Sequence, residues 1–193
     1  MEKLKLKALE NHIPIVRDKT ASVLMEKCKE KNPKRILEIG TAIGYSCLLM
    51  LQNCDAFVVT IEKNEDRMIE AKENIKQFGQ SDRVDFRLSD ALEELKKIDQ
   101  SGDKFDFVFL DGAKGQYLSY YPYIKSILNK DGILFADNID LNGLVLSPER
   151  ITHKNRAMAT KMIKFLDQIK NDQDFKTEFY HIDDGFLIAE KLF

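Results

Sequence analysis

Short apolar runs alternate with longer segments of helical periodicity along most of the chain. Five of these runs are rich in Val, Ile, Leu and Phe on both faces, which is typical of parallel strands that are covered by helices on each side. They span residues 34–39, 56–62, 83–88, 105–111 and 132–138. Repeated strand–helix units predict a parallel sheet with right-handed crossovers and helices on both faces.

The intervals between these runs carry helix start and stop signals. One helix is expected from Asn64, a good N-cap, to Gly79, a good C-terminal stop. Two helices are expected before the first strand, over residues 3–11 and 18–31, and Asp18 is the predicted N-cap of the second. The other helices are expected after Gly44, from near Asp90, over about 116–128 and near 153–171.

The end of the chain has a different pattern. The runs "FKTEFYHI" and "GFLIAEKLF" alternate apolar and polar residues and are separated by Asp-Asp-Gly. Asp-Gly between two such runs is a hairpin signal. The prediction is therefore one α/β domain over residues 1–193, whose sheet ends in an antiparallel hairpin.

Composition narrows the class of protein. A chain of 193 residues fits one domain, and 44% hydrophobic with 32% charged residues is an ordinary globular balance. No apolar run approaches the ~20 residues that span a bilayer, and the N-terminal segment lacks the apolar stretch of a secretory signal, so no membrane partner is expected. The three cysteines have no CxxC spacing, which predicts reduced thiols in a cytoplasmic protein.

Charge is distributed unevenly. The net charge is −2, but residues 1–35 carry ten Lys/Arg against five Asp/Glu, and residues 147–164 carry five against one. The segment between them is acidic, with twelve Lys/Arg against nineteen Asp/Glu. Two interpretations of the basic segments remain open. They could be helix faces exposed to solvent, or they could bind a polyanion.

The stretch "ILEIGTAIGYS" (36–46) combines a strand end with a glycine turn. A turn of this kind lets a ligand approach the backbone closely, although packing alone also explains such glycines. The dinucleotide fingerprint GxGxxG is incomplete, because Ala42 occupies its middle glycine position. The carboxylate of Glu38 would repel a diphosphate and attract a cationic group, so the turn suits a cationic ligand better than NAD.

Two further acids follow the next two strands. Glu62 lies twenty-two residues after Gly40, where an acid can accept hydrogen bonds from both ribose hydroxyls. Asp90 could read an adenine edge, or it could simply cap a helix. Three acids at three successive strand ends outline an adenosine with a positive tail, and S-adenosylmethionine has that shape.

Oxygen ligands cluster at the ends of the fourth and fifth strands. Asp111 ends one strand, and Asp137 and Asn138 end the next. Two carboxylates and an amide oxygen form a hard donor set that suits Mg²⁺, with Mn²⁺ or Ca²⁺ as other candidates. The alternative is that these residues only terminate strands and cap turns.

The motifs "ILEIGTAIGYS", "DGAKGQY" and "ADN", in this order and spacing, resemble the metal-dependent O-methyltransferases related to catechol and caffeoyl-CoA O-methyltransferases. The likeness runs from about His12 to the end and is greatest to the bacterial branch that methylates wobble 5-hydroxyuridine in tRNA to 5-methoxyuridine. It implies a Rossmann-like class I methyltransferase fold with a seven-stranded, mostly parallel sheet. It also implies S-adenosylmethionine and Mg²⁺ or Mn²⁺ as cofactors; methylation of a small catechol-like molecule is the alternative.

The resemblance assigns roles to individual residues. The cofactor-binding set is Val16, Glu38, Gly40, Ser46, Glu62, Asp90, Ala91 and Asp111, with Val16 acting through its backbone. The metal-binding set is Asp111, Asp137 and Asn138. The catalytic pair is Lys114 and Asp111, with Lys114 beside the reacting oxygen. The N-terminal helices within residues 1–33 are expected to cover the site, and the sequence departs from the family in a short N-terminus and in Gly112, where Ala is usual.

Both candidate substrates have two adjacent oxygens. In catechol these are the two hydroxyls, and in 5-hydroxyuracil they are the hydroxyl O5 and the carbonyl O4. For tRNA, the anticodon loop is the expected partner, and four basic residues are expected to contact it: Arg17, His153, Lys154 and Arg156. An exposed helix start explains the last three equally well. Relatives are often dimers, so a homodimer is compatible with the resemblance.

Overall fold

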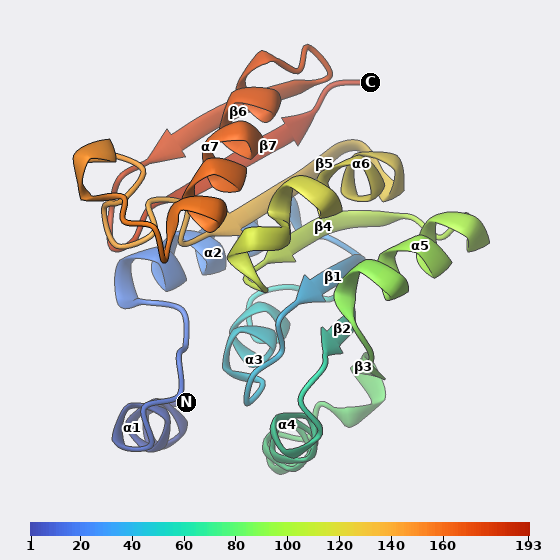
Figure 1. The fold of residues 1–193 in the computed structure, drawn as a ribbon. Coiled ribbons are helices and arrows are strands. Elements are labelled where there is room, and N and C mark those ends of the chain that lie inside the picture. Colours follow the sequence, from blue (N-terminus) through green and yellow to red (C-terminus); the bar gives the residue numbers. More distant parts are fainter.

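The computed structural model describes residues 1–193, except for the side chain of Pro148. Its centre is a seven-stranded sheet in the order β3-β2-β1-β4-β5-β7-β6 (Figure 1). The strands are β1 (Arg35–Ile39), β2 (Phe57–Glu62), β3 (Val84–Leu88), β4 (Phe105–Leu110), β5 (Leu128–Asp137), β6 (Phe175–Tyr180) and β7 (Phe186–Lys191). The first five strands pair in parallel, and β7 is antiparallel to both β5 and β6. The predicted Rossmann-like sheet with its C-terminal hairpin is confirmed.

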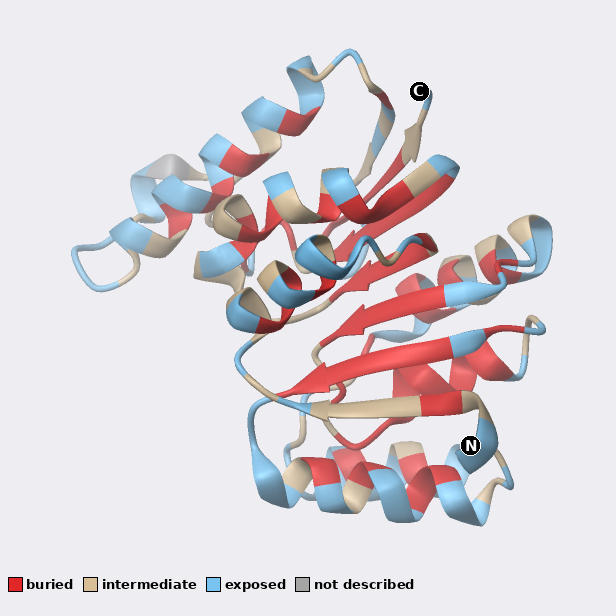
Figure 2. Cartoon of the chain, turned by 90° about the vertical axis from the view of Figure 1, so that its right-hand side faces the viewer, coloured by how far each residue is buried: buried red, intermediate tan, exposed pale blue. Residues whose placement is uncertain are grey.

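Helices cover both faces of this sheet, as predicted (Figures 1 and 2). The helices are α1 (Glu2–Glu10), α2 (Asp18–Lys31), α3 (Tyr45–Leu51), α4 (Glu65–Gln77), α5 (Ala91–Ser101), α6 (Tyr117–Ile127) and α7 (Arg156–Asn171). Apolar residues of α5, α6 and α7 form one core cluster with the sheet, and those of α1 to α4 form the other. The sheet therefore lies between two apolar layers, which explains why its strands are apolar on both faces.

Strand alternation decides which layer each side chain of β1 enters. Leu37 and Ile39 belong to the core cluster beneath α5 and α6, whereas Ile36 belongs to the cluster beneath α2 and α3. Successive side chains in a strand point to opposite faces. Glu38 consequently points toward the α2–α3 layer.

Two of the expected helix caps can be compared directly. The side chain of Asn64 accepts a hydrogen bond from the backbone N–H of Arg67 at 2.9 Å, so its predicted N-cap role is confirmed. The prediction for Asp18 is wrong, because α2 already includes it and Arg17 is the N-cap. Asp183, from the β6–β7 loop, instead accepts the backbone N–H of Thr20 at 3.0 Å, while Asp18 pairs with Lys5.

Element boundaries differ from the predictions in three places. β5 begins at Leu128, earlier than expected, because residues on both sides of the Gly132 turn pair with β4. α7 begins at Arg156, and the residues from 153 precede it as a turn. The hairpin loop spans residues 181–185, and it is longer than a two-residue Asp-Gly turn because it also contacts α2 and the segment after β5.

Among the described residues, none of the helices has both the length and the apolar character needed to cross a bilayer.

Candidate active site

A cleft of about 930 Å³ opens at the carboxyl ends of the parallel strands. From β1 the chain adds β2 and β3 on one side, and from β4 it adds β5 on the other side. Open parallel sheets bind ligands at the carboxyl ends of the strands, next to the point where the strand order reverses in this way. Residues that follow β1, β2, β3, β4 and β5 line the cleft, together with the segment between α1 and α2. The predicted site residues that line it are Gly40, Glu62, Asp90, Ala91, Asp111, Lys114, Asn138 and Arg17.

The glycine turn after β1 is built around Gly40. Its φ is 103°, and a Cβ there would lie 2.4 Å from the backbone oxygen of Asp111. Only glycine fits both conditions, because the backbone is in the left-handed region and the neighbouring strand end is in direct contact. The turn thus brings the ends of β1 and β4 together at the floor of the cleft.

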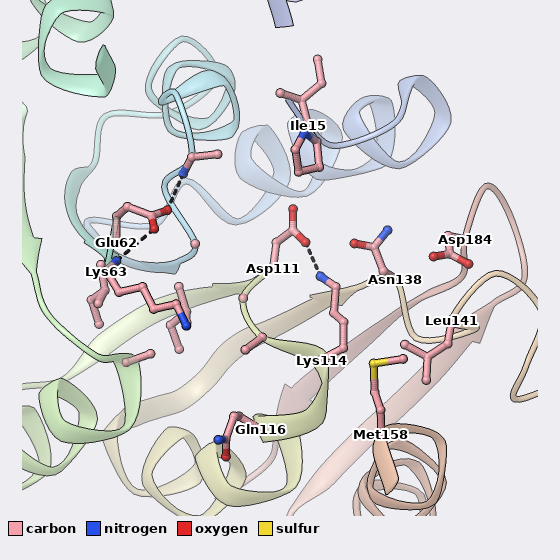
Figure 3. A pocket seen from close by; sticks show the side chains of 18 of the residues that line it. Ile15, Glu62, Lys63, Asp111, Lys114, Gln116, Asn138, Leu141, Met158 and Asp184 are labelled. Atoms are coloured by element: carbon pink, nitrogen blue, oxygen red, sulfur yellow. Dashed lines mark hydrogen bonds and ion pairs between the residues drawn. The ribbon is translucent and has the colours of Figure 1, made fainter. Parts of the chain in front are cut away.

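Glu62 holds this turn from the end of β2. One of its carboxylate oxygens accepts the backbone N–H of Ala42 at 3.0 Å, and the other accepts that of Lys63 at 3.0 Å (Figure 3). The second oxygen also accepts the backbone N–H of Asn64 at 2.9 Å. A carboxylate has about four acceptor positions. Glu62 can therefore brace the turn and still accept a hydrogen bond from a ligand hydroxyl in the cleft.

Glu38 does not line the cleft, which corrects the expected contact with a methionine group. Its side chain is fully buried and accepts hydrogen bonds from Ser46 Oγ at 2.6 Å and Thr60 Oγ1 at 2.5 Å. Burial raises the pKa of Glu38 to about 7, although the two hydroxyl donors oppose this shift. Ser46 is buried with it, so both residues support the turn from below.

Two other residues predicted to bind the cofactor, Asp90 and Val16, have structural roles and also lie in or next to the cleft lining. Asp90 caps α5 by accepting the backbone N–H of Leu92 at 2.9 Å, so the capping interpretation is correct, and it also lines the cleft. The side chain of Val16 is buried in the core, while its neighbours Ile15 and Arg17 line the cleft. The N-terminal segment therefore forms part of the cleft wall.

Asp111 and Lys114 form an ion pair at the centre of the cleft (Figure 3). Lys114 Nζ also donates to Tyr117 Oη at 3.0 Å. Burial lowers the pKa of Lys114, but the neighbouring Tyr117 and Asp111 outweigh burial and raise it above its usual value. Lys114 is thus an ammonium group held against the cleft floor.

The end of β5 supplies the remaining predicted oxygen ligands. Asn138 lines the cleft with a φ of 55°, and its backbone N–H donates to Asp137 Oδ1 at 2.7 Å. Asp137 is only 2% exposed, and burial followed by repulsion from Asp111 raises its pKa. Among the described residues no three His, Cys, Asp or Glu side chains gather in a metal-binding group. The predicted donor set contains only two carboxylates, and its third member is the side-chain amide of Asn138, which lines the cleft.

This donor set fits a hard cation. Its groups are two carboxylates and an amide oxygen, and the carboxylates repel one another across a site with one ammonium group. A divalent cation would relieve that repulsion and would find the oxygen ligands that Mg²⁺ prefers.

Several cleft residues were not identified from the sequence. They are Leu9, Ile13, Pro14, Ile15, Lys63, Arg67, Gln116, Tyr120, Leu141, Asn142, Leu144, Arg150, Met158 and Asp184. Most lie in loops whose approach to the sheet edge depends on tertiary structure. Of the predicted RNA contacts, only Arg17 lines the cleft; His153, Lys154 and Arg156 are exposed at the start of α7, where a turn and a helix end hold them outside it.

The sheet order, the terminal hairpin and the cleft define a Rossmann-like α/β methyltransferase. A family model described as O-methyltransferase matches residues 2–192, so the chain belongs to that family. Relatives include a catechol O-methyltransferase of Niastella koreensis, 29% identical over 66% of this chain and 58% of its own length. The chain spans between 47% and 80% of the length of the curated relatives it matches, which are mostly of caffeoyl-CoA type.

Solved structures agree with this placement. A protein from Staphylococcus aureus, provisionally assigned as a caffeoyl-CoA O-methyltransferase, is 30% identical with a TM-score of 0.90, covering 98% of this chain and 91% of its own. An O-methyltransferase from Bacillus cereus, solved with S-adenosylhomocysteine, has a TM-score of 0.87 at 22% identity, covering 98% of this chain and 89% of its own. The class is that of the S-adenosylmethionine-dependent O-methyltransferases of caffeoyl-CoA and catechol type.

Glu62→Ala is expected to weaken S-adenosylmethionine binding about tenfold or more, because it removes a charged acceptor worth roughly 1.5–3 kcal/mol. Calorimetry measures the dissociation constant. Glu65→Ala, a neighbouring exposed acid in the first turn of α4, is the matched control and should bind normally. An unchanged dissociation constant for Glu62→Ala would remove this residue from the cofactor site.

Proposed function

We propose that the protein transfers the methyl group of S-adenosylmethionine to one of two adjacent oxygens of its acceptor, with the help of a divalent cation. The observation that carries the proposal is the cluster of Asp111, Lys114 and Asn138 at the centre of the cleft, beside the turn held by Glu62. S-adenosylmethionine would lie along the turn and Glu62, since the free acceptor positions of Glu62 suit the hydroxyls of a ribose and Asp90 also lines the cleft.

Mg²⁺ is the proposed cation, with Mn²⁺ as a substitute, and Asp111, Asp137 and Asn138 would hold it. When bound, it would supply positive charge for two neighbouring acceptor oxygens and favour ionisation of one of them. Lys114 would stabilise the negative charge on the reacting oxygen, because the raised pKa keeps its amine protonated. The wall formed by Ile15, Leu141 and Met158 would exclude water while the methyl carbon passes from sulfur to oxygen.

Two acceptor classes have support. The relatives named for catechol and caffeoyl-CoA favour a small catechol-like molecule. Four basic side chains that line the cleft, Arg17, Lys63, Arg67 and Arg150, favour an acceptor that carries phosphates, such as 5-hydroxyuridine in the anticodon loop of tRNA. For tRNA, the product would be 5-methoxyuridine at the wobble position.

A comparison of two acceptors tests the substrate proposal. The protein is incubated with labelled S-adenosylmethionine, Mg²⁺ and either tRNA that carries 5-hydroxyuridine or a free catechol, and the products are identified by nucleoside and small-molecule analysis. If tRNA is the acceptor, turnover falls steeply with salt, because each phosphate contact releases counterions. A catechol turned over at least as efficiently as tRNA establishes the small-molecule reading.

On the tRNA reading, Arg17→Ala and Arg150→Ala should weaken tRNA binding and reduce its salt slope by about one unit each. Lys154→Ala and Arg156→Ala, outside the cleft lining, test whether the start of α7 also contacts phosphates. Lys170→Ala, exposed in the last turn of α7, is the control and should leave the slope unchanged. If neither arginine variant changes the slope, the cleft does not hold phosphates.

A further inference from the structure

The hydroxyl of Tyr117 joins three parts of the candidate active site. Tyr117 is the first residue of α6 and is fully buried. Its Oη lies 3.0 Å from Lys114 Nζ, 3.0 Å from the carbonyl oxygen of Leu110 and 3.1 Å from that of Asp137. Leu110 ends β4 directly before Asp111, and Asp137 ends β5 directly before Asn138. One hydroxyl therefore contacts the lysine and both strand ends that carry the oxygen ligands.

The hydrogen-bonding capacity of a phenol accounts for this arrangement. A tyrosine hydroxyl donates one proton and also accepts. Its proton is shared between the carbonyls of Leu110 and Asp137, and its oxygen accepts an N–H of the Lys114 ammonium. The three partners belong to the end of β4, the end of β5 and the segment that follows β4, so the hydroxyl cannot move without losing at least one of these contacts.

The ring is held as firmly as the hydroxyl. Tyr117 packs edge-on against Phe165 of α7, with ring centroids 5.7 Å apart and an interplanar angle of 84°. Phe165 is itself fully buried. Packing of this kind fixes side-chain orientation in a core. The position of the hydroxyl is thus set by α6 and α7, not by the mobile end of a long side chain.

We propose that Tyr117 is a positioning residue for methyl transfer. Its hydroxyl holds Lys114 at the centre of the cleft and ties that lysine to the ends of β4 and β5, so that the ammonium and the oxygen ligands keep one relative placement. This inference rests on the proposed role of Lys114 in the reaction. Among the described residues the polar partners of Lys114 Nζ are the carboxylate of Asp111 and the hydroxyl of Tyr117. Of these two, Tyr117 is the fully buried one and is also bonded to the ends of β4 and β5.

Tyr121 provides a matched control for a purely structural role. It lies one turn further along α6, is also fully buried, and packs edge-on against the same Phe165 at 5.8 Å. Its hydroxyl donates to Asp172 Oδ2 at 2.8 Å, away from the cleft. Tyr121→Phe therefore removes one buried hydroxyl in the same packing environment without touching the site.

The experiment compares Tyr117→Phe with Tyr121→Phe in the presence of Mg²⁺, with hydroxylated tRNA and a free catechol as acceptors. Tyr117→Phe should lower kcat about ten- to hundredfold, the effect of losing a hydrogen bond to a charged group, while KM for S-adenosylmethionine stays within about twofold. Tyr121→Phe should leave kcat within about twofold. Thermal unfolding of both variants shows whether their stabilities are comparable. Equal losses of kcat, or a loss only in KM, would overturn the proposal.

Lys114→Met completes a double-mutant cycle. If Tyr117 acts through Lys114, adding Tyr117→Phe to Lys114→Met should cost less than about twofold, whereas independent effects would multiply. Multiplying effects overturn the positioning role. A wild-type protein that methylates neither acceptor, or a Lys114→Met variant with normal kcat, instead overturns the proposed function on which this inference rests.

Discussion

Asp137→Ala should lower methyl transfer about a hundredfold or more, a loss at the upper end of what disturbance of a metal site causes. Affinity for S-adenosylmethionine should stay within about twofold, because Asp137 is buried and is absent from the cleft lining where the cofactor would bind. Transfer of a labelled methyl group measures the first effect and calorimetry the second.

In Asp137→Ala, the loss of the charged carboxyl should not by itself destabilise the folded state. Burial, followed by repulsion from Asp111, raises the pKa of Asp137. In the metal-free protein, ionisation of this carboxyl therefore costs folding free energy. The cost grows as the pH rises from the ordinary pKa of an aspartate to the raised pKa of Asp137. Removing this carboxyl should therefore flatten the decline of the unfolding midpoint over that range. Asp131→Asn, at an exposed position beside Gly132 within β5, is the control. Normal methyl transfer by Asp137→Ala would exclude Asp137 from the reaction.

Lys114→Met should lower kcat about a hundredfold or more, as the loss of a charge-stabilising donor does in other enzymes. Methionine fills a similar volume, and removing the ammonium leaves the Glu62 turn untouched, so S-adenosylmethionine should still bind. Rapid-quench measurement of the first turnover separates the chemical step from product release. A first turnover within about threefold of the wild-type rate would show that Lys114 does not stabilise the reacting oxygen.

The fold was predictable because its signals are local and consistent. Strands apolar on both faces indicate a parallel sheet, and Asn64 marks a helix start whose cap is made within four residues. The prediction that Asp18 caps α2 was wrong because the hydrogen-bond partner at this helix start is distant in the sequence. In the first turn of α2, the backbone N–H of Thr20 donates to Asp183, which is 163 residues away, and no local pattern indicates such a partner.

The candidate site was predictable where a residue directly follows a strand. Asp111, Asn138 and Glu62 line the cleft because parallel strands end at one edge. The predicted contact of Glu38 with the cofactor was wrong, although its position in the strand already indicated which face of the sheet its side chain would enter. Alternation along β1 points it away from Leu37 and Ile39, and its register partner Thr60 offers a hydroxyl on the same side.

Arg150 and Asp184 could not be placed from sequence. Each lies in a segment whose path back to the sheet edge depends on tertiary contacts. Asp184, for example, reaches the cleft because the β6–β7 loop bonds to the segment after β5 through Asp140 and Ile139. Basic residues near position 150 were recognised as a group, but only the fold distinguishes Arg150 in the cleft from Lys154 outside it.

The central claim is that a divalent cation held by Asp111, Asp137 and Asn138 supports methyl transfer. The most direct measurement is transfer of labelled methyl from S-adenosylmethionine to hydroxylated tRNA and to a free catechol, before and after metal removal by a chelator. The account predicts that excess chelator abolishes transfer to the true acceptor and that added Mg²⁺ or Mn²⁺ restores it. Full activity in excess chelator would contradict it.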